Sequence, residues 1–230
     1  MADNRQLWDR YQAQLFTDER LGFSLDVSRM DLDDAFFAAH ATATQRALDD
    51  MAKLEAGALA NPDEKRMVGH YWLRASRLAP TAELRALIED TLTSIHRFSS
   101  DVHAGKLRPE AAPQFSNLLV VGIGGSALGP QLVADALGGA TDRMKVFFFD
   151  NTDPDGIDRV LAQLEEQGGM PHTLTVVISK SGGTKETRNG MLEAQAAYRA
   201  CGLDPARHMV AVTGEGSELD RLAVAEGWLR

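Results

Sequence analysis

The hydrophobic and polar positions of this 230-residue chain follow one pattern up to about residue 105 and another from residue 115 onward. In the first part, apolar residues recur at steps of three and four, which is the spacing of one face of an amphipathic helix. The pattern is clearest over residues 81–103 and predicts a helix there. We therefore expect the first part to be helical, with almost no strand.

Two further features of the first part predict where helices lie. A second helix is expected over residues 32–56, with its apolar side chains turned into a core. At Asn61 a capping side chain precedes Pro62, whose missing N–H costs nothing at the first helical position, and Glu64 can reach back. This stretch predicts that another helix begins at residue 61. The inward-facing residues of the second helix are expected to be Phe36, Phe37, Leu48, Met51 and Leu54.

The second part of the chain contains short apolar runs instead. They read "NLLVVGI", "KVFFFD", "LTVVIS" and "HMVAVT", and helical segments separate them. Consecutive Val, Ile, Leu and Phe residues indicate strands that are covered on both faces. Alternation of such strands with helices predicts a parallel sheet in a doubly wound α/β domain. The stretch 105–114, with Gly105, Pro109 and Pro113, is the expected connector between the two parts.

The first of these strands runs into glycines, in "LLVVGIGGSALGP" at residues 118–130. A strand, a Gly-rich turn and a helix start together indicate a phosphate-binding loop. Gly122, Gly124 and Ala127 fit the G-x-G-x-x-G/A pattern of a dinucleotide site, and Asp150 ends the next strand, where such a site places a ribose-binding acid. Taken alone, this match leaves a dinucleotide cofactor and a sugar phosphate both open.

A second Gly-rich stretch, "ISKSGGTKETRNG" at residues 178–190, follows the third strand. Glycines let backbone N–H groups approach an anion closely, and hydroxyl side chains add neutral donors without filling the space. Helix capping would explain one or two hydroxyls here. The full set favours a sugar-phosphate site, because a dinucleotide fold needs no such loop at its third strand. The hydroxyl residues around the two glycines are Ser179, Ser181, Thr184 and Thr187.

Composition and charge exclude several classes of function. The net charge is −9, from 24 basic and 33 acidic residues, and no Lys/Arg run offers the basic face that nucleic acid requires. No apolar stretch approaches the length of a membrane span, and the N-terminus lacks the apolar core of a signal peptide. Cys201 is the single cysteine, so no internal disulfide can form, and a cytoplasmic location is expected. The six histidines lack the spacing of metal ligands, so no metal site is expected.

Three stretches together resemble the first sugar-isomerase (SIS) domain of the glucose-6-phosphate isomerase family, in its bacterial form. They are "VVGIGGSALGP", "FDNTDPDGIDRVL" and "ISKSGGTKETRNGM", and similarity extends to "DVSRM", "NPDEKRMVGHYWLR" and "DVHAGKL". The resemblance implies an α/β fold with a doubly wound parallel sheet of four to five strands. This flavodoxin-like SIS domain is expected over residues 115–230, preceded by a helical N-terminal segment over residues 1–105.

The resemblance also assigns residues of both Gly-rich loops to the substrate. The first loop touches the sugar, the hydroxyls of the second hold the 6-phosphate, and Gly182, Gly183 and Lys180 supply backbone N–H groups. Glu186 either helps to orient catalytic groups or only favours the helix N-terminus electrostatically. The implied substrate-binding residues are Gly125, Ser126, Ser179, Lys180, Ser181, Gly182, Gly183 and Thr184.

Asp150, the candidate ribose ligand, becomes part of "DNTDP" when the resemblance is followed. In that stretch Asp153 most simply caps the helix that Pro154 opens.

The implied reaction is reversible isomerisation of glucose 6-phosphate to fructose 6-phosphate through an enediol, without a cofactor. It needs a general base, conventionally a glutamate, and groups that stabilise negative charge. In family members these lie in a second SIS domain and a C-terminal tail, which we expect this chain to lack. The chain would then hold no catalytic residue of its own, and its exposed surfaces would need the missing C-terminal half or a homo-oligomer partner.

The sequence leaves two alternatives from other classes open. The first is a non-catalytic sugar-phosphate-binding SIS module, and the second is an NAD-dependent dehydrogenase.

Overall fold

The computed structural model describes residues 3–30 and 32–229, and the chain divides into two compact units, Met1–Thr91 and Leu92–Arg230. Helix α4, Ala82–His103, begins in the first unit and ends in the second. The sequence-based boundaries at residues 105 and 115 stay a prediction. No helix within the described residues is long and apolar enough to cross a membrane.

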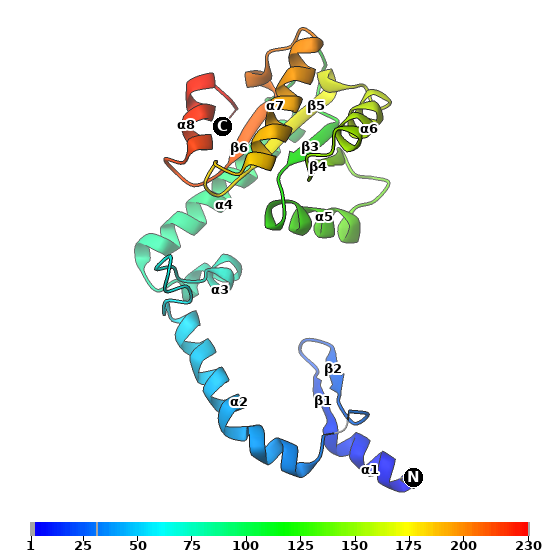
Figure 1. Ribbon diagram of the computed structural model, residues 1–230, viewed down its shortest axis with the longest axis vertical. Helices are drawn as coiled ribbons and strands as arrows, with labels where there is room; N and C mark the ends of the chain where they lie inside the picture. The colour runs from blue at the N-terminus through cyan, green and yellow to red at the C-terminus, as the bar shows by residue number, and fades with distance from the viewer. Residues whose placement is uncertain (1–2, 31, 230) are drawn as a thin grey trace. The chain divides into compact units, whose positions relative to one another are not determined.

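The first unit is mostly helical, as expected, but it also contains a β-hairpin (Figure 1). Strands β1 and β2 pair antiparallel, with Leu15 opposite Asp26 and Asp18 opposite Phe23. The expectation of almost no strand was therefore wrong at this point, because each strand is only four residues long and too short to show a period of two. The elements of this unit are α1 (Asn4–Gln14), β1 (Leu15–Asp18), β2 (Phe23–Asp26), α2 (Asp34–Glu55), α3 (His70–Arg74) and a 3-10 turn (Ser76–Leu78), followed by the start of α4.

The helix predicted to begin at Asn61 does not form. The Asn61 side chain does accept hydrogen bonds from the backbone N–H groups of Asp63 and Glu64, both at 3.1 Å, as a capping residue would. The chain then turns back at Lys65, whose φ is +52°, and Asn61 pairs with Arg66 in an antiparallel bridge. The local capping signal was real, but a tight turn uses it instead of a helix.

Helix α2 forms where the sequence predicts it, but its apolar side chains are not buried. Phe36 and Phe37 are 39% and 44% exposed, and Leu48 and Met51 are 56% and 51% exposed. Phe36 stacks on His40 and meets Phe37 edge-on, so these rings contact each other rather than a core. The expectation of an inward-facing apolar stripe was wrong for these four residues, while Leu54, the fifth, is half-buried.

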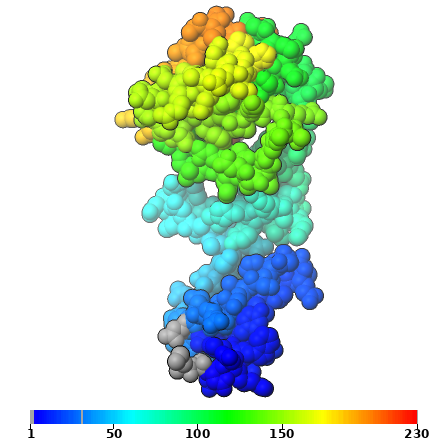
Figure 2. Space-filling view, turned by 90° about the vertical axis from the view of Figure 1, so that its right-hand side faces the viewer, coloured from blue at the N-terminus to red at the C-terminus, as the bar shows by residue number. Residues whose placement is uncertain are grey.

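The second unit is built on a four-stranded, fully parallel sheet (Figure 1). The four apolar runs of the sequence form its strands, and their order across the sheet is β4-β3-β5-β6. In the space-filling view the green to orange atoms of this unit form one continuous body (Figure 2). The strands are β3 (Asn117–Val121), β4 (Lys145–Phe149), β5 (Thr173–Ile178) and β6 (Met209–Val212). The helices between and after them are α5 (Gly125–Leu137), α6 (Pro154–Glu165), α7 (Lys185–Ala200) and α8 (Glu218–Glu226).

Helices cover both faces of this sheet. The crossover through α5 leads from β3 to β4, and the crossover through α6 leads back past β3 to β5, so right-handed connections place these helices on opposite faces. The larger core packs α6, α7 and α8 against Leu119, Val121 and Val177. A smaller core on the other face joins Val102 of α4 to Phe115 and Leu174. The doubly wound parallel sheet is thereby confirmed, with four strands.

Candidate functional site

The strand order places two Gly-rich loops side by side at one edge of the sheet. From β3 the chain moves to β4 on one side, and it then crosses to β5 on the other side. Such a reversal opens a crevice outside the carboxyl ends of the two central strands, and ligands of open α/β sheets bind there. Val121 and Val177 are register partners, so the loops that follow β3 and β5 leave the sheet at the same level.

The first loop begins at Gly122, which lies tightly against the second. A Cβ atom at Gly122 would stand 2.9 Å from the Cβ of Ser126 and 3.3 Å from the carbonyl oxygen of Ile178. Only a residue without a side chain lets the two loops approach this closely. Gly125 faces open space, since a Cβ there would meet no atom within 4 Å, and Ser126 is half-buried. Both residues lie in the first turn of α5, directly after the first loop.

In the second loop, two serine hydroxyls bond to the loop's own backbone. The Gly182 N–H donates to Oγ of Ser179 at 3.1 Å, and the Gly183 N–H donates to Oγ of Ser181 at 3.2 Å. Ser179 is buried, and its Oγ also donates to Oγ1 of Thr184 at 3.4 Å. Ser181 is exposed, so its hydroxyl is open to a ligand from solvent.

Lys180 and Glu186 both lie at this loop with exposed side chains. Glu186 belongs to the first turn of α7, where its charge interacts favourably with the helix dipole. The structure thus brings all the substrate-binding residues that the sequence predicted to the two loops at the carboxyl ends of β3 and β5.

The helices after these two loops differ from the other helices of the sheet at their N-termini. Within the described chain, α5 and α7 begin without a side-chain cap, although Thr184 occupies the N-cap position of α7. By contrast, Asp153 caps α6 by accepting from the Gly156 N–H, and Ser217 caps α8 by accepting from the Asp220 N–H. The first backbone N–H groups of a helix need a partner from outside it, and an anion serves well because the helix dipole is positive there.

The prediction for Asp153 and Pro154 is confirmed, because α6 begins at Pro154 with Asp153 as its cap. Asp150 is engaged within the protein: one carboxylate oxygen accepts from Gln131 at 2.7 Å and the other from Asn151 at 2.9 Å. It ties α5 to the loop after β4, a role that the sequence did not suggest because Gln131 lies on the preceding helix.

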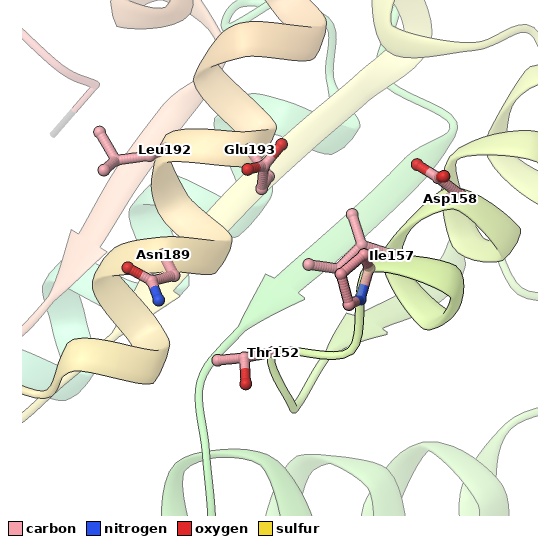
Figure 3. A pocket seen from close by; sticks show the side chains of 7 residues that line it. Thr152, Ile157, Asp158, Asn189, Leu192 and Glu193 are labelled. Atoms are coloured by element: carbon pink, nitrogen blue, oxygen red, sulfur yellow. The ribbon is translucent and has the colours of Figure 1, made fainter.

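Of the cavities among the described residues of this unit, two adjoin helix α7. One of about 190 Å³ lies under the second loop, where Ser179 and Gly182 meet Leu219 of α8. Another of about 230 Å³ lies between α6 and α7, with Thr152, Asn189, Asp158 and Glu193 around it (Figure 3). The carboxylates of Asp158 and Glu193 would repel a phosphate, so the second cavity does not suit one.

A buried polar cluster lies at the opposite, amino ends of the strands. The Tyr198 hydroxyl donates to the carbonyl of Thr173 at 2.9 Å and contacts Oγ1 of Thr175 at 2.8 Å, and burial raises the pKa of Tyr198 well above its usual range. His208, fully buried, contacts the same carbonyl through Nδ1 at 3.0 Å, and burial lowers its pKa. Tyr198 and His208 share the Thr173 carbonyl, and Nε2 of His208 is buried without a partner among the described residues. Because the cluster is closed to solvent, we interpret it as structural.

Comparisons with known proteins agree on one family. The model of the phosphoglucose isomerase family matches residues 26–227. The chain is 62% identical over 224 residues to a glucose-6-phosphate isomerase of Geobacter sulfurreducens, and 55% identical over 225 residues to one of Synechococcus elongatus. These alignments cover 97% and 98% of this chain and 42% of each relative, so the chain spans less than half the length of the relatives it matches.

A solved structure shows the same relationship. The crystal structure of a glucose-6-phosphate isomerase from Chlamydia trachomatis superposes with a TM-score of 0.76 at 29% identity, over 92% of this chain and 41% of that one. Sequence and structure therefore lead to the same conclusion: the chain belongs to the phosphoglucose isomerase family.

Proposed function

We propose that this chain provides the sugar- and phosphate-binding part of an enzyme that interconverts glucose 6-phosphate and fructose 6-phosphate, a step of glycolysis and gluconeogenesis. The observation that carries the proposal is the pair of uncapped helix N-termini at the crevice, one of them behind a loop rich in hydroxyls. A phosphate in the crevice would supply the anionic partner that those N-termini favour.

In this proposal the second loop holds the 6-phosphate. The hydroxyls of Ser179, Ser181 and Thr184 donate to phosphate oxygens, together with backbone N–H groups of Lys180, Gly182 and Gly183. Two of those N–H groups now bond to serine oxygens at 3.1 and 3.2 Å, and the phosphate would replace these neutral acceptors with charged ones. Hydrogen bonds to a charged acceptor are roughly twice as strong, so the exchange favours binding.

The sugar would extend from the phosphate toward the first loop, where Gly125 and Ser126 contact it. No side chain crowds that position, because the space around Gly125 is open. The general base and the groups that stabilise the enediol would come from outside residues 1–230, from a part that corresponds to the rest of the relatives' length. Glu186 would act on those groups from the first turn of α7, as a positioning residue.

Binding of a 6-phosphosugar acid tests the phosphate site. Calorimetric titration with 6-phosphogluconate should show saturable binding, and titration with NAD should show none. Thr184→Val should weaken 6-phosphogluconate binding by about 1 kcal/mol, roughly fivefold, because one donor to a charged group is lost. Thr152→Val is the matched control: it removes a hydroxyl from the neighbouring loop after β4 and should leave the affinity unchanged. Equal affinities of the Thr184 variant and the unaltered chain would contradict this placement of the phosphate.

Activity separates the proposed enzyme from a non-catalytic SIS module. The chain alone should not isomerise glucose 6-phosphate, whereas addition of the remaining part of a relative, such as the Geobacter sulfurreducens protein, should produce activity. Isomerisation at a normal rate by the chain alone would refute the absence of the catalytic base. Binding without activity in the reconstituted pair would favour the module.

A further inference from the structure

Three consecutive carbonyl groups of the second loop are held by the residues that follow β6. The carbonyl oxygen of Ser179 accepts from Oγ1 of Thr213 at 2.6 Å. The carbonyls of Lys180 and Ser181 accept from the backbone N–H groups of Gly214 at 3.2 Å and Glu218 at 3.3 Å. We call residues 213–218 the supporting segment.

These three contacts orient the loop for an anion. In a planar trans peptide, the carbonyl of one residue and the N–H of the next point in opposite directions. Carbonyls that point to the supporting segment therefore turn the N–H groups of Lys180, Ser181 and Gly182 away from it. Because carbonyl oxygens would repel a phosphate and N–H groups attract one, this orientation is what an anion site requires.

Thr213 is the one side chain of the supporting segment that takes part in these three contacts. A short chain of hydrogen bonds, which we call the relay, fixes the direction in which its hydroxyl donates. A carbonyl oxygen can only accept, so the Thr213 hydroxyl donates its single hydrogen to the carbonyl of Ser179. Ser217 Oγ, 2.6 Å from Oγ1 of Thr213, must then donate to it, and Ser217 in turn accepts from the Asp220 N–H at 3.0 Å. The relay links the first turn of α8 to the first residue of the loop.

The second loop also packs closely against the start of α8, beside the relay. Gly182 has a φ of +77°, and a Cβ atom there would stand 2.3 Å from the backbone nitrogen of Leu219. The loop and the start of α8 are thus in direct backbone contact. Movement of the supporting segment would move the loop.

We propose that Thr213 is a positioning residue for the phosphate: it does not touch the ligand, and it acts through the carbonyl of Ser179. The proposal rests on the proposed function of the second loop. It adds to the phosphate site a residue that directly follows the neighbouring strand β6. The hydroxyl of Thr213, rather than the size of its side chain, would hold the loop in position.

The test compares three variants with the unaltered chain in titrations with inorganic phosphate and with 6-phosphogluconate. Thr213→Val keeps the side-chain shape and removes the hydroxyl, and it should weaken both ligands by the same factor, about fivefold to tenfold. Thr213→Ser keeps the hydroxyl and should bind within about twofold of the unaltered chain. Thr175→Val is the matched control, because it removes a buried hydroxyl within β5 that bonds to Tyr198 instead of the loop. It should lower the melting temperature without changing either affinity.

The outcomes separate this proposal from the function on which it rests. Unchanged binding by Thr213→Val, equal loss in Thr213→Ser, or equal loss in Thr175→Val would each overturn the positioning role alone, while binding by the unaltered chain would still support a phosphate site. Failure of the unaltered chain to bind 6-phosphogluconate would overturn both. Amide NMR shifts of Gly182 and Gly183 give an independent readout: they should move in Thr213→Val and stay in place in Thr175→Val.

Discussion

Four strands of the second unit each lead into a helix, and these four turns fall into two kinds. The turns after β4 and β6 end in Asp153 and Ser217, which cap the helices that follow. The turns after β3 and β5, equally within the described chain, end in Gly124 and Thr184 and provide no side-chain cap. A helix N-terminus that is not capped from within is stabilised when a ligand supplies the missing acceptor. The difference fits the proposed function, in which the two central turns give up local stability and leave their helix N-termini to an anion.

The largest expected effect comes from forcing the uncapped second loop out of position. Gly182→Ala places a methyl group 2.3 Å from the backbone nitrogen of Leu219, at a φ of +77° that alanine rarely adopts. We expect 6-phosphogluconate affinity to fall by more than about tenfold and stability by about 1–3 kcal/mol, from strain and clash together. Calorimetry and urea unfolding measure the two changes.

Gly202→Ala is the control for this variant. Gly202 has a φ of +72°, but a Cβ atom there would meet nothing within 4 Å. It should therefore lose stability from backbone strain alone and bind as before. If both variants lost the same affinity, the contact with α8 would have no part in the loop's geometry.

A smaller effect is expected from removing a cap at one of the other two turns. Asp153→Ala deletes the oxygen that accepts from the Gly156 N–H at 3.1 Å. The free energy of unfolding should fall by about 1 kcal/mol, the usual cost of losing a cap, and the affinity for 6-phosphogluconate should not change. Asp153→Asn, which keeps an acceptor, should recover most of the stability. A marked loss of affinity in the alanine variant would break the distinction between the two kinds of turn.

The smallest effect is expected at the far ends of the same strands, where polar groups serve stability instead of binding. Burial lowers the pKa of His208. The hydrogen bond to the Thr173 backbone and the charges of Glu110 and Asp204 oppose this shift, and Arg207 adds to it. The folded state therefore keeps this histidine neutral at a pH where the unfolded chain takes up a proton, so the unfolding free energy should fall as the pH drops below about 6.5.

Urea unfolding measures how the unfolding free energy depends on pH. A range from about pH 7.5 to about pH 5.5 spans the usual histidine pKa of about 6.5. His208→Gln removes the titratable ring and should flatten the curve. An unchanged slope in His208→Gln would place the acid sensitivity elsewhere.

Much of the second unit could be predicted because its signals are local. Consecutive apolar residues indicated each strand, the glycines and hydroxyls indicated both loops, and the pair Asp153-Pro154 indicated a capped helix start. Strand–helix alternation then limited the topology to a parallel sheet, which brings both loops to one edge.

What the sequence did not predict depends on contacts between distant residues. The hydroxyl of Thr213 meets the carbonyl of Ser179, 34 positions earlier in the chain, only because β6 lies beside β5. A hydroxyl at the end of a strand was visible in "HMVAVT", but its partner was not. In the first unit, a correct local signal led to a wrong element. The capping hydrogen bonds of Asn61 form as predicted, but they close a turn instead of starting a helix.

If the loop binds phosphate as proposed, the hydrogen bonds through Thr213 and Ser217 would also couple the dynamics of α8 to occupancy of the loop. The Asp220 amide donates to Ser217, and its exchange with solvent deuterium requires local opening that breaks this bond. A ligand that binds only the closed arrangement makes that opening rarer in proportion to its saturation. Slower deuterium uptake at Asp220 would therefore report phosphate on a loop that this amide never touches.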